Sequence, residues 1–143
     1  LNMMPTFINT HPVSERIKDA TEILAKRRTH LEQKEYRSAH LYYNLERYRA
    51  AAIAFETLLN KYPESASGED YKLMVVKSYY RFAKMSVLEK QIERYEKVIS
   101  EYEDFTDRYP ESAKLKDAEE FLNLSKNQIK QIRDEQITSS AKR

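Results

Sequence analysis

The side chains that most often carry chemistry lie in this sequence without the spacing that a reaction needs. The three histidines, His11, His30 and His40, have no cysteine or carboxylate grouping that would make a metal site. The chain contains one glycine, Gly68, so it cannot build a glycine-rich phosphate loop. Its serines lack the sequence signature of a nucleophile. We therefore expect no catalytic residue, no cofactor and no metal ion, and we predict that the protein is not an enzyme.

A basic run at residues 26–28, Lys-Arg-Arg, could contact a phosphate or a lipid headgroup. Successive residues on a helix point about 100° apart, so a solvated helix face explains this run better. The whole chain has 25 basic and 23 acidic residues, a net charge of +2 that gives no strong attraction to nucleic acid. We therefore expect no nucleic-acid partner.

Charge is distributed unevenly along the chain. Residues 14–49 contain nine basic and six acidic side chains, whereas residues 89–111 contain four basic and eight acidic ones. The acidic stretch could speed the encounter with a basic partner. An ordinary solvated helix face is the alternative interpretation.

Three of the four prolines occupy the same sequence context. YPES occurs at 62–65 and again at 109–112, 47 residues later, and the looser copy HPVS occurs at 11–14. A helix stops before a proline because the preceding residue is pushed out of the α region. The serine two residues after each proline can accept N–H groups of the next helix. The tetrapeptide is therefore predicted to be a helix–turn–helix joint, and Ser67 with Asp70 to form an approximate capping box.

Apolar residues between these joints recur with a period of about 3.6, which is typical of amphipathic helices. We expect helices near 14–46, 48–61, 67–88, 90–108 and 113–135, the first of them long enough to break near 30–34. The stripes expected to be buried are Ile17, Ala20, Leu24 and Leu31; Ala51, Phe55, Leu58, Leu59 and Tyr62; Tyr71, Val75, Ser78, Tyr79, Phe82 and Met85; Ile92, Tyr95, Ile99, Tyr102, Phe105 and Tyr109; and Leu115, Ala118, Leu122 and Ile129.

The helices follow the tetratricopeptide pattern, in which small residues allow close packing and a proline closes each unit. With Pro63 at the closing position, the expected small and aromatic positions are Ala39, Tyr42, Ala51 and Phe55. Pro110 places Val98, Tyr102 and Phe105 in the same way, and the extra residues SVLEKQIER at 86–94 lengthen that unit. This extra stretch is either a partner contact or an extension of the scaffold.

We therefore predict an all-α fold, a tetratricopeptide-like helical repeat array (α-solenoid) with elongated helices. We expect residues 1–143 to form one repeat domain, a C-terminal one according to the family resemblance described below. It comprises the end of a preceding repeat at 1–12, with the end of a previous helix at 1–9, a repeat at 13–63, a repeat at 64–110, a C-terminal helix at 111–136 and a frayed tail at 137–143.

Four motifs, DAT at 19–21, KEYRSAHLYY at 34–43, YRAA at 48–51 and the closing YPES, occur in the order and spacing of the BamD family, which this chain resembles. Residues 69–123 resemble the last repeat in family versions with a longer insertion, so the resemblance covers about residues 11–125. The lipid-bearing cysteine and the first repeats of that family are not in this sequence, as expected of a C-terminal part.

The resemblance implies a scaffold of the β-barrel assembly machinery on the periplasmic face of the outer membrane. The full-length protein would be lipid-anchored, with membrane contact only through an anchor outside this chain. The implied partners are the POTRA domains of a BamA-like insertase, other lipoproteins of the machinery and unfolded outer-membrane proteins. One alternative is another periplasmic tetratricopeptide adaptor in cell-envelope or division complexes. A soluble enzyme subunit or regulatory module is a further alternative, which the lack of a catalytic constellation disfavours.

On the tetratricopeptide template, the first helix of each pair lines an inner groove. The residues expected there are polar or aromatic, which suits the binding of a peptide or loop. The alternative is that several of the tyrosines pack between helices. The predicted partner-binding residues are Gln33, Tyr36, Arg37, His40, Tyr43, Asn44, Lys77, Tyr80, Arg81 and Lys84.

Overall fold

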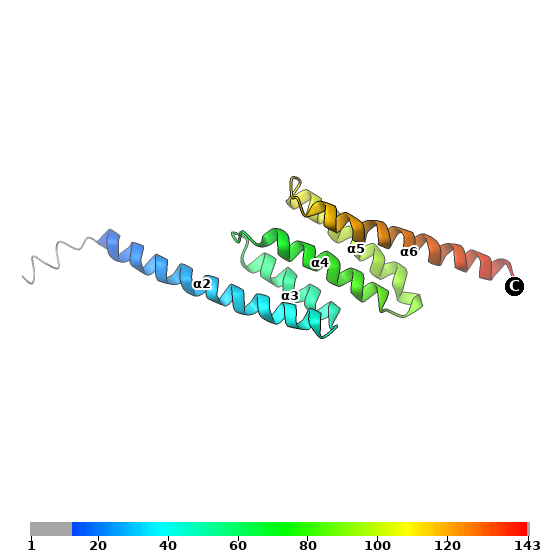
Figure 1. The fold of residues 1–143 in the computed structure, drawn as a ribbon, viewed down its shortest axis with the longest axis horizontal. Helices are drawn as coiled ribbons and strands as arrows, with labels where there is room; N and C mark the ends of the chain where they lie inside the picture. The colour runs from blue at the N-terminus through cyan, green and yellow to red at the C-terminus, as the bar shows by residue number, and fades with distance from the viewer. Residues whose placement is uncertain (1–12, 143) are drawn as a thin grey trace, which may run out of the picture. The chain divides into compact units, whose positions relative to one another are not determined.

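The computed structural model describes residues 13–142 (Figure 1). Its helices are α2 (Val13–Asn44), α3 (Tyr48–Lys61), α4 (Gly68–Lys84), α5 (Leu88–Arg108) and α6 (Leu115–Ala141), and the described residues contain no strand. The predicted all-α fold class is confirmed. The end of a previous helix predicted at residues 1–9 lies outside the described residues.

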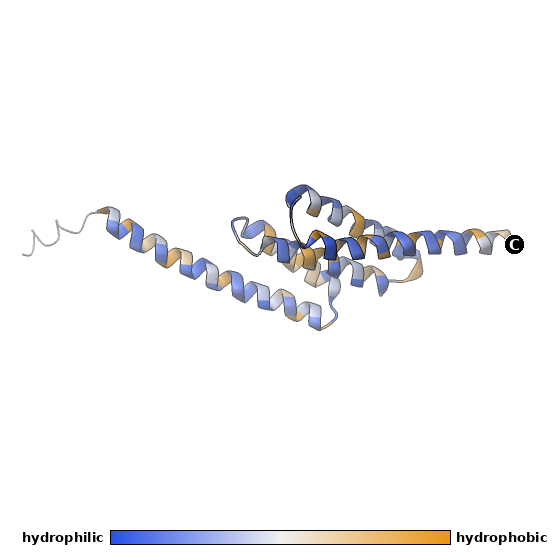
Figure 2. Cartoon of the chain, turned by 45° about the horizontal axis from the view of Figure 1, so that its top comes forward, coloured by the Kyte–Doolittle hydropathy of each residue, from blue (hydrophilic) through white to orange (hydrophobic). Residues whose placement is uncertain are grey.

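The chain divides into two units, residues 1–34 and residues 35–143. The described part of the first unit is the beginning of α2, on which hydrophobic and hydrophilic residues alternate (Figure 2). The apolar residues predicted to be buried there are exposed, Leu24 to 64% and Leu31 to 50%, since this unit has no second described element to cover them. The helix also runs through residues 30–34 without the predicted break, because this segment contains neither glycine nor proline.

The second unit is a stack of neighbouring helices. α3 packs against α4, α4 against α5 and α5 against α6, and α4 also contacts α6. One core cluster contains Ala39 of α2 with Ala51 and Phe55 of α3, all fully buried, and the other is built around residues such as Phe105 of α5. Tyr79 packs against both clusters, so the two cores are continuous through α4. This succession is the packing of a helical repeat array.

The two YPES joints have the same backbone geometry. The Ser65 N–H donates to the Tyr62 carbonyl at 3.0 Å, and the Ser65 hydroxyl accepts the N–H of Ser67 at 3.1 Å. The same bonds recur 47 residues later, around Tyr109 and Ser112, at 3.1 Å each. The predicted helix–turn–helix joint is therefore present at both copies.

The predicted capping box at the start of α4 is not formed. Ser67 is the N-cap residue, but it has φ −91° and ψ 6° instead of the extended conformation of a side-chain cap, and its hydroxyl makes no cap bond. Asp70 forms an ion pair with Lys114 of the second joint instead. The first turn of α4 is thus tied to the joint that follows α5.

The single glycine lies where the second joint meets the first turn of α4. Gly68 is buried, and a β-carbon there would overlap the hydroxyl oxygen of Tyr109. Its φ is not positive, so its backbone conformation does not require glycine. The close approach of the Tyr109 side chain therefore explains why a residue without a side chain occupies position 68.

We expect Gly68→Ala to destabilise the chain by about 2 kcal/mol, because the added methyl group displaces Tyr109. In a Tyr109→Phe background the same substitution should be neutral or stabilising by about 0.5 kcal/mol, since the overlap is gone and alanine favours a helix over glycine. Urea unfolding of the parent, both single variants and the double variant, followed by circular dichroism, measures the two effects. Equal destabilisation in both backgrounds would contradict this packing.

The ends of two helices differ from the prediction. α4 ends at Lys84 instead of near residue 88, which leaves Met85 in the turn and 63% exposed, although its spacing predicted burial. α6 continues through Ala141, where a frayed tail was predicted from residue 137. Its last turns contain no glycine or proline, so nothing in the sequence stops the helix there.

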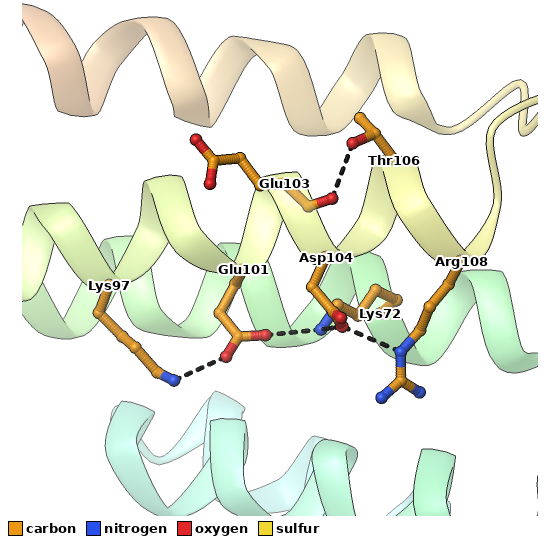
Figure 3. Close-up of polar contacts among 7 residues, drawn as sticks. All are labelled: Lys72, Lys97, Glu101, Glu103, Asp104, Thr106 and Arg108. Carbon is orange, nitrogen blue, oxygen red and sulfur yellow. Dashed lines mark hydrogen bonds and ion pairs between the residues drawn. The ribbon is translucent and has the colours of Figure 1, made fainter.

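A buried charge network joins α4 to α5 (Figure 3). The Lys72 ammonium lies 2.6 Å from a carboxylate oxygen of Glu101 and 2.6 Å from one of Asp104, and only 1% of Lys72 is exposed. Lys97 pairs with the other Glu101 oxygen at 2.8 Å. Burial raises the pKa of Glu101, but the hydrogen bonds from Lys72 and Lys97 outweigh burial and hold the pKa below its usual value. Part of the acidic stretch at 89–111 is therefore internal instead of solvated.

Candidate functional site

Four of the predicted partner-binding residues come together on the second unit. On α2, the ring of His40 lies 5.8 Å from that of Tyr36 and 6.3 Å from that of Tyr43, centroid to centroid. Lys77 of α4 places its ammonium nitrogen 5.4 Å from the centre of the Tyr43 ring, within the range of a cation–π contact. We call Tyr36, His40, Tyr43 and Lys77 the aromatic row.

Contacts with α3 and α4 hold the aromatic row in place. The Tyr36 ring meets Phe55 edge-on, with centroids 6.0 Å apart, and lies 5.9 Å from the ring of Tyr71. The Tyr43 ring meets Tyr48 edge-on at 5.1 Å. Tyr36 and Tyr43 pack against the core cluster that contains Phe55, and all three rings of the row are only partly buried. The two interpretations of these tyrosines, packing and binding, are therefore compatible.

The amide of Asn44 orients the histidine of the row. Its nitrogen lies 3.2 Å from His40 Nδ1, one turn earlier on α2. With the amide as donor, Nδ1 accepts and the other ring nitrogen, Nε2, carries the proton. His40 can then donate a hydrogen bond to a carbonyl oxygen of a partner.

Tyr80 was predicted to bind a partner, and the structure corrects this. Only 9% of its surface is exposed, and its ring packs between Tyr95 at 6.0 Å and Phe121 at 5.3 Å. It lies on the face of α4 that is turned toward α5 and α6, so it belongs to the core.

The remaining predicted residues are exposed. Arg37 of α2 and Arg81 and Lys84 of α4 add positive charge to the same helices as the aromatic row. Gln33 is also exposed, but it belongs to the first unit and is not placed with the others.

A second surface lies at the α2–α3 and α4–α5 turns; residues 86–94 were predicted from the sequence as a possible partner contact, but Leu45 and Met85 were not. Leu45, Met85, Val87 and Leu88 are 57–63% exposed there, and we call these four residues the turn patch. Turns are usually built from glycine, proline and small polar residues. The apolar residues in the α4–α5 turn were the signal that could have revealed this surface.

The extra residues at 86–94 hold the α4–α5 turn rigid. The Gln91 amide donates to the carbonyls of Ser86 at 3.1 Å and Lys84 at 3.3 Å. Arg94 donates to the Ser86 hydroxyl at 2.6 Å, and its guanidinium lies 4.3 Å from the centre of the Phe82 ring. This stretch therefore extends the scaffold and also fixes the conformation of an exposed apolar turn.

The side chains on these two surfaces are suited to binding another protein. In the part of the chain from residue 13 to 142, no three histidine, aspartate or glutamate side chains are grouped to hold a metal ion. No helix in that part is both long and apolar enough to cross a membrane. The aromatic row supplies ring surface, one N–H donor and a positive charge, which can bind a protein segment.

Comparison with known protein families identifies the family of this chain. A family model described as an outer membrane lipoprotein, YfiO, matches residues 1–94. The match includes α2, α3, α4 and the beginning of α5, and with them the aromatic row and the turn patch. A search among curated proteins found no match. Since the match covers well over half of the 143 residues, the chain belongs to the YfiO family of outer membrane lipoproteins.

Proposed function

We propose that this chain is a non-catalytic scaffold of the outer-membrane β-barrel assembly machinery. It docks POTRA domains of a BamA-like insertase on the periplasmic face of the outer membrane and helps to deliver or insert outer-membrane proteins. Membership of the outer membrane lipoprotein family supports this proposal, as does the resemblance of residues 34–51 and the YPES joints to the BamD family. Other lipoproteins of the machinery and unfolded outer-membrane proteins are its further proposed partners.

The observation that carries the proposal is the aromatic row. Its rings follow one another along α2 at about one helical turn, and a half-buried cation from α4, Lys77, lies beside them. A row of this kind suits a loop or an extended segment, which can place successive side chains against successive rings. Because both tyrosine rings already pack against the core, they lose little side-chain freedom on binding.

Binding of the purified chain to the POTRA domains of the insertase from the same genome tests the proposal. Isothermal titration calorimetry at about 150 mM salt screens most long-range charge effects while leaving close contacts intact. We expect a defined complex with a dissociation constant in the range of about 1 μM. Absence of binding by a chain that circular dichroism shows to be helical would contradict the proposal and favour a different envelope adaptor.

We expect the double substitution His40→Ala with Tyr43→Ala to weaken POTRA binding by about tenfold or more, because it removes a donor and an aromatic anchor from the row. The helical circular dichroism signal should stay that of the parent, since both residues are only partly buried. Tyr42→Ala is the matched control: Tyr42 lies on the same helix, is 42% exposed and is not part of the row. Unchanged affinity of the double variant would remove the row from the docking surface.

A further inference from the structure

The two turns that carry the turn patch also enclose a concave site. A cavity of about 460 Å³ is lined by Glu46 and Tyr48 from the α2–α3 side and by Met85, Val87 and Arg94 from the α4–α5 side. Two exposed apolar turns thus frame a hollow whose lining includes one acidic and one basic residue. A hollow of this size accepts one or two side chains from a partner.

The turn patch is preorganised for binding. Apolar side chains on a flexible loop lose conformational freedom when a partner covers them, which weakens binding. Here the bonds from Gln91 and Arg94 to Ser86 already hold the α4–α5 turn, and the patch residues Val87 and Leu88 follow directly. Covering these residues therefore costs little conformational entropy, which favours a contact with a partner.

The charge around the turn patch favours an acidic partner. Residues 45–49 and 81–90 together contain five basic side chains, Arg47, Arg49, Arg81, Lys84 and Lys90, and two acidic ones, Glu46 and Glu89. The net charge of this end is therefore +3, whereas residues 89–111 as a whole carry a net charge of −4. A partner with an acidic surface is therefore attracted to the two turns.

The turn patch also continues the surface of the predicted binding residues. Asn44 and Lys84 directly precede Leu45 and Met85 in the sequence, and Asn44 is bonded to His40 of the aromatic row. A partner segment that lies along the row toward the ends of α2 and α4 therefore reaches the patch.

We propose that the turn patch is the anchor point for an acidic face of a folded protein, which places an apolar side chain in the cavity between the two turns. The inference rests on the proposed function, in which this folded protein is a POTRA domain. A lipid surface is the less suitable occupant, because the site is concave and its lining includes the acidic residue Glu46.

Val87→Asp tests the anchor without risk to the fold. Val87 is the N-cap residue of α5, has the extended conformation of a cap, with φ −60° and ψ 149°, and makes no side-chain cap bond. Aspartate is a preferred residue at this position, so we expect the unfolding midpoint to rise by about 3 °C. The same substitution removes apolar contact and sets a negative charge against an acidic partner. We therefore expect POTRA binding to weaken by about tenfold or more.

Leu24→Asp is the matched control. Leu24 is 64% exposed and belongs to the first unit, and its replacement by aspartate introduces the same negative charge as Val87→Asp. Its affinity for the POTRA domains should equal that of the parent chain. Parent-like affinity of Val87→Asp would overturn the anchor while leaving the proposed function intact. Failure of the parent chain itself to bind would overturn both.

A vesicle experiment separates the protein partner from a membrane. The parent chain and Val87→Asp are sedimented with vesicles of phosphatidylethanolamine and phosphatidylglycerol. We expect neither to sediment with the vesicles. Sedimentation of the parent chain that Val87→Asp abolishes would show that the turn patch contacts lipid, and the inference of a protein anchor would then be wrong.

Discussion

Ala51→Glu should unfold the centre of the second unit. Ala51 is fully buried in the cluster that contains Ala39 and Phe55, where its small side chain lets helices pack closely. A glutamate there must either carry an unpaired charge into the core or push the helices apart, at a cost of about 4 kcal/mol. This cost is a large part of the total stability of a domain of this size. We expect a fall of the unfolding midpoint by more than about 10 °C, measured by circular dichroism at 222 nm.

Ile53→Glu is the control for that experiment, because Ile53 lies two residues further on α3 and is 49% exposed. It should change the free energy of unfolding by less than about 0.5 kcal/mol. Hydrogen exchange can then locate the damage. Loss of protection in Ala51→Glu should be greatest in α3 and the first turns of α4, and least in α5 and α6, whose core cluster contains neither Ala51 nor its buried neighbours Ala39 and Phe55. Parent-like melting of Ala51→Glu would contradict the assigned repeat register.

The repeat architecture could be predicted from the sequence because its signals are local. Proline and the residue before it stop a helix whatever packs nearby, so the two YPES joints could be located from four residues each. The small residues Ala39 and Ala51 were predicted from their spacing to Pro63, and both are fully buried. Signals of this kind depend on neighbours within one or two turns, which a single sequence contains.

Features that depend on residues far apart in the sequence could not be predicted in the same way. Lys72 is buried because Glu101, 29 residues later, supplies its partner on another helix. The place of Gly68 is explained by Tyr109, from the next joint. No pattern around Lys72 or Gly68 indicates these partners, since each pair forms only when α4 and α5 have packed.

The candidate site could be predicted only where its residues are close in the sequence. The helical spacing of Tyr36, His40 and Tyr43 places them on one face of α2, and the structure shows them in a row. Tyr80 was misassigned because its face is decided by the position of Phe121, 41 residues later. The exposure of Met85 depends on where α4 ends, and helix ends are the least predictable part of an element.

Replacing Glu101 by leucine should destabilise the second unit by about 3 kcal/mol, because the Lys72 ammonium stays buried with only Asp104 beside it. The double variant Lys72→Met with Glu101→Leu should recover most of this loss, since two apolar side chains of similar length can fill the space of a buried ion pair. Urea unfolding of both single variants and the double variant gives the coupling energy. Additive effects would show that the pair does not act as a unit.

The buried charge network also predicts how the stability of the chain changes with pH, and the same variants test this prediction. The pKa of Glu101 and that of Asp104 lie below their usual values in the folded chain, in each case because lysine or arginine bonds outweigh burial. A carboxyl group with a lowered folded-state pKa contributes stability that is complete above its unfolded pKa, about 4, and is lost as the pH falls through the folded value. The free energy of unfolding of the parent chain should therefore decrease between about pH 5 and pH 2, and that of the double variant should decrease less. Identical slopes in the parent and the double variant would place the acid-sensitive groups elsewhere in the chain, and Lys72 would then be held by packing of its alkyl stem more than by its charge.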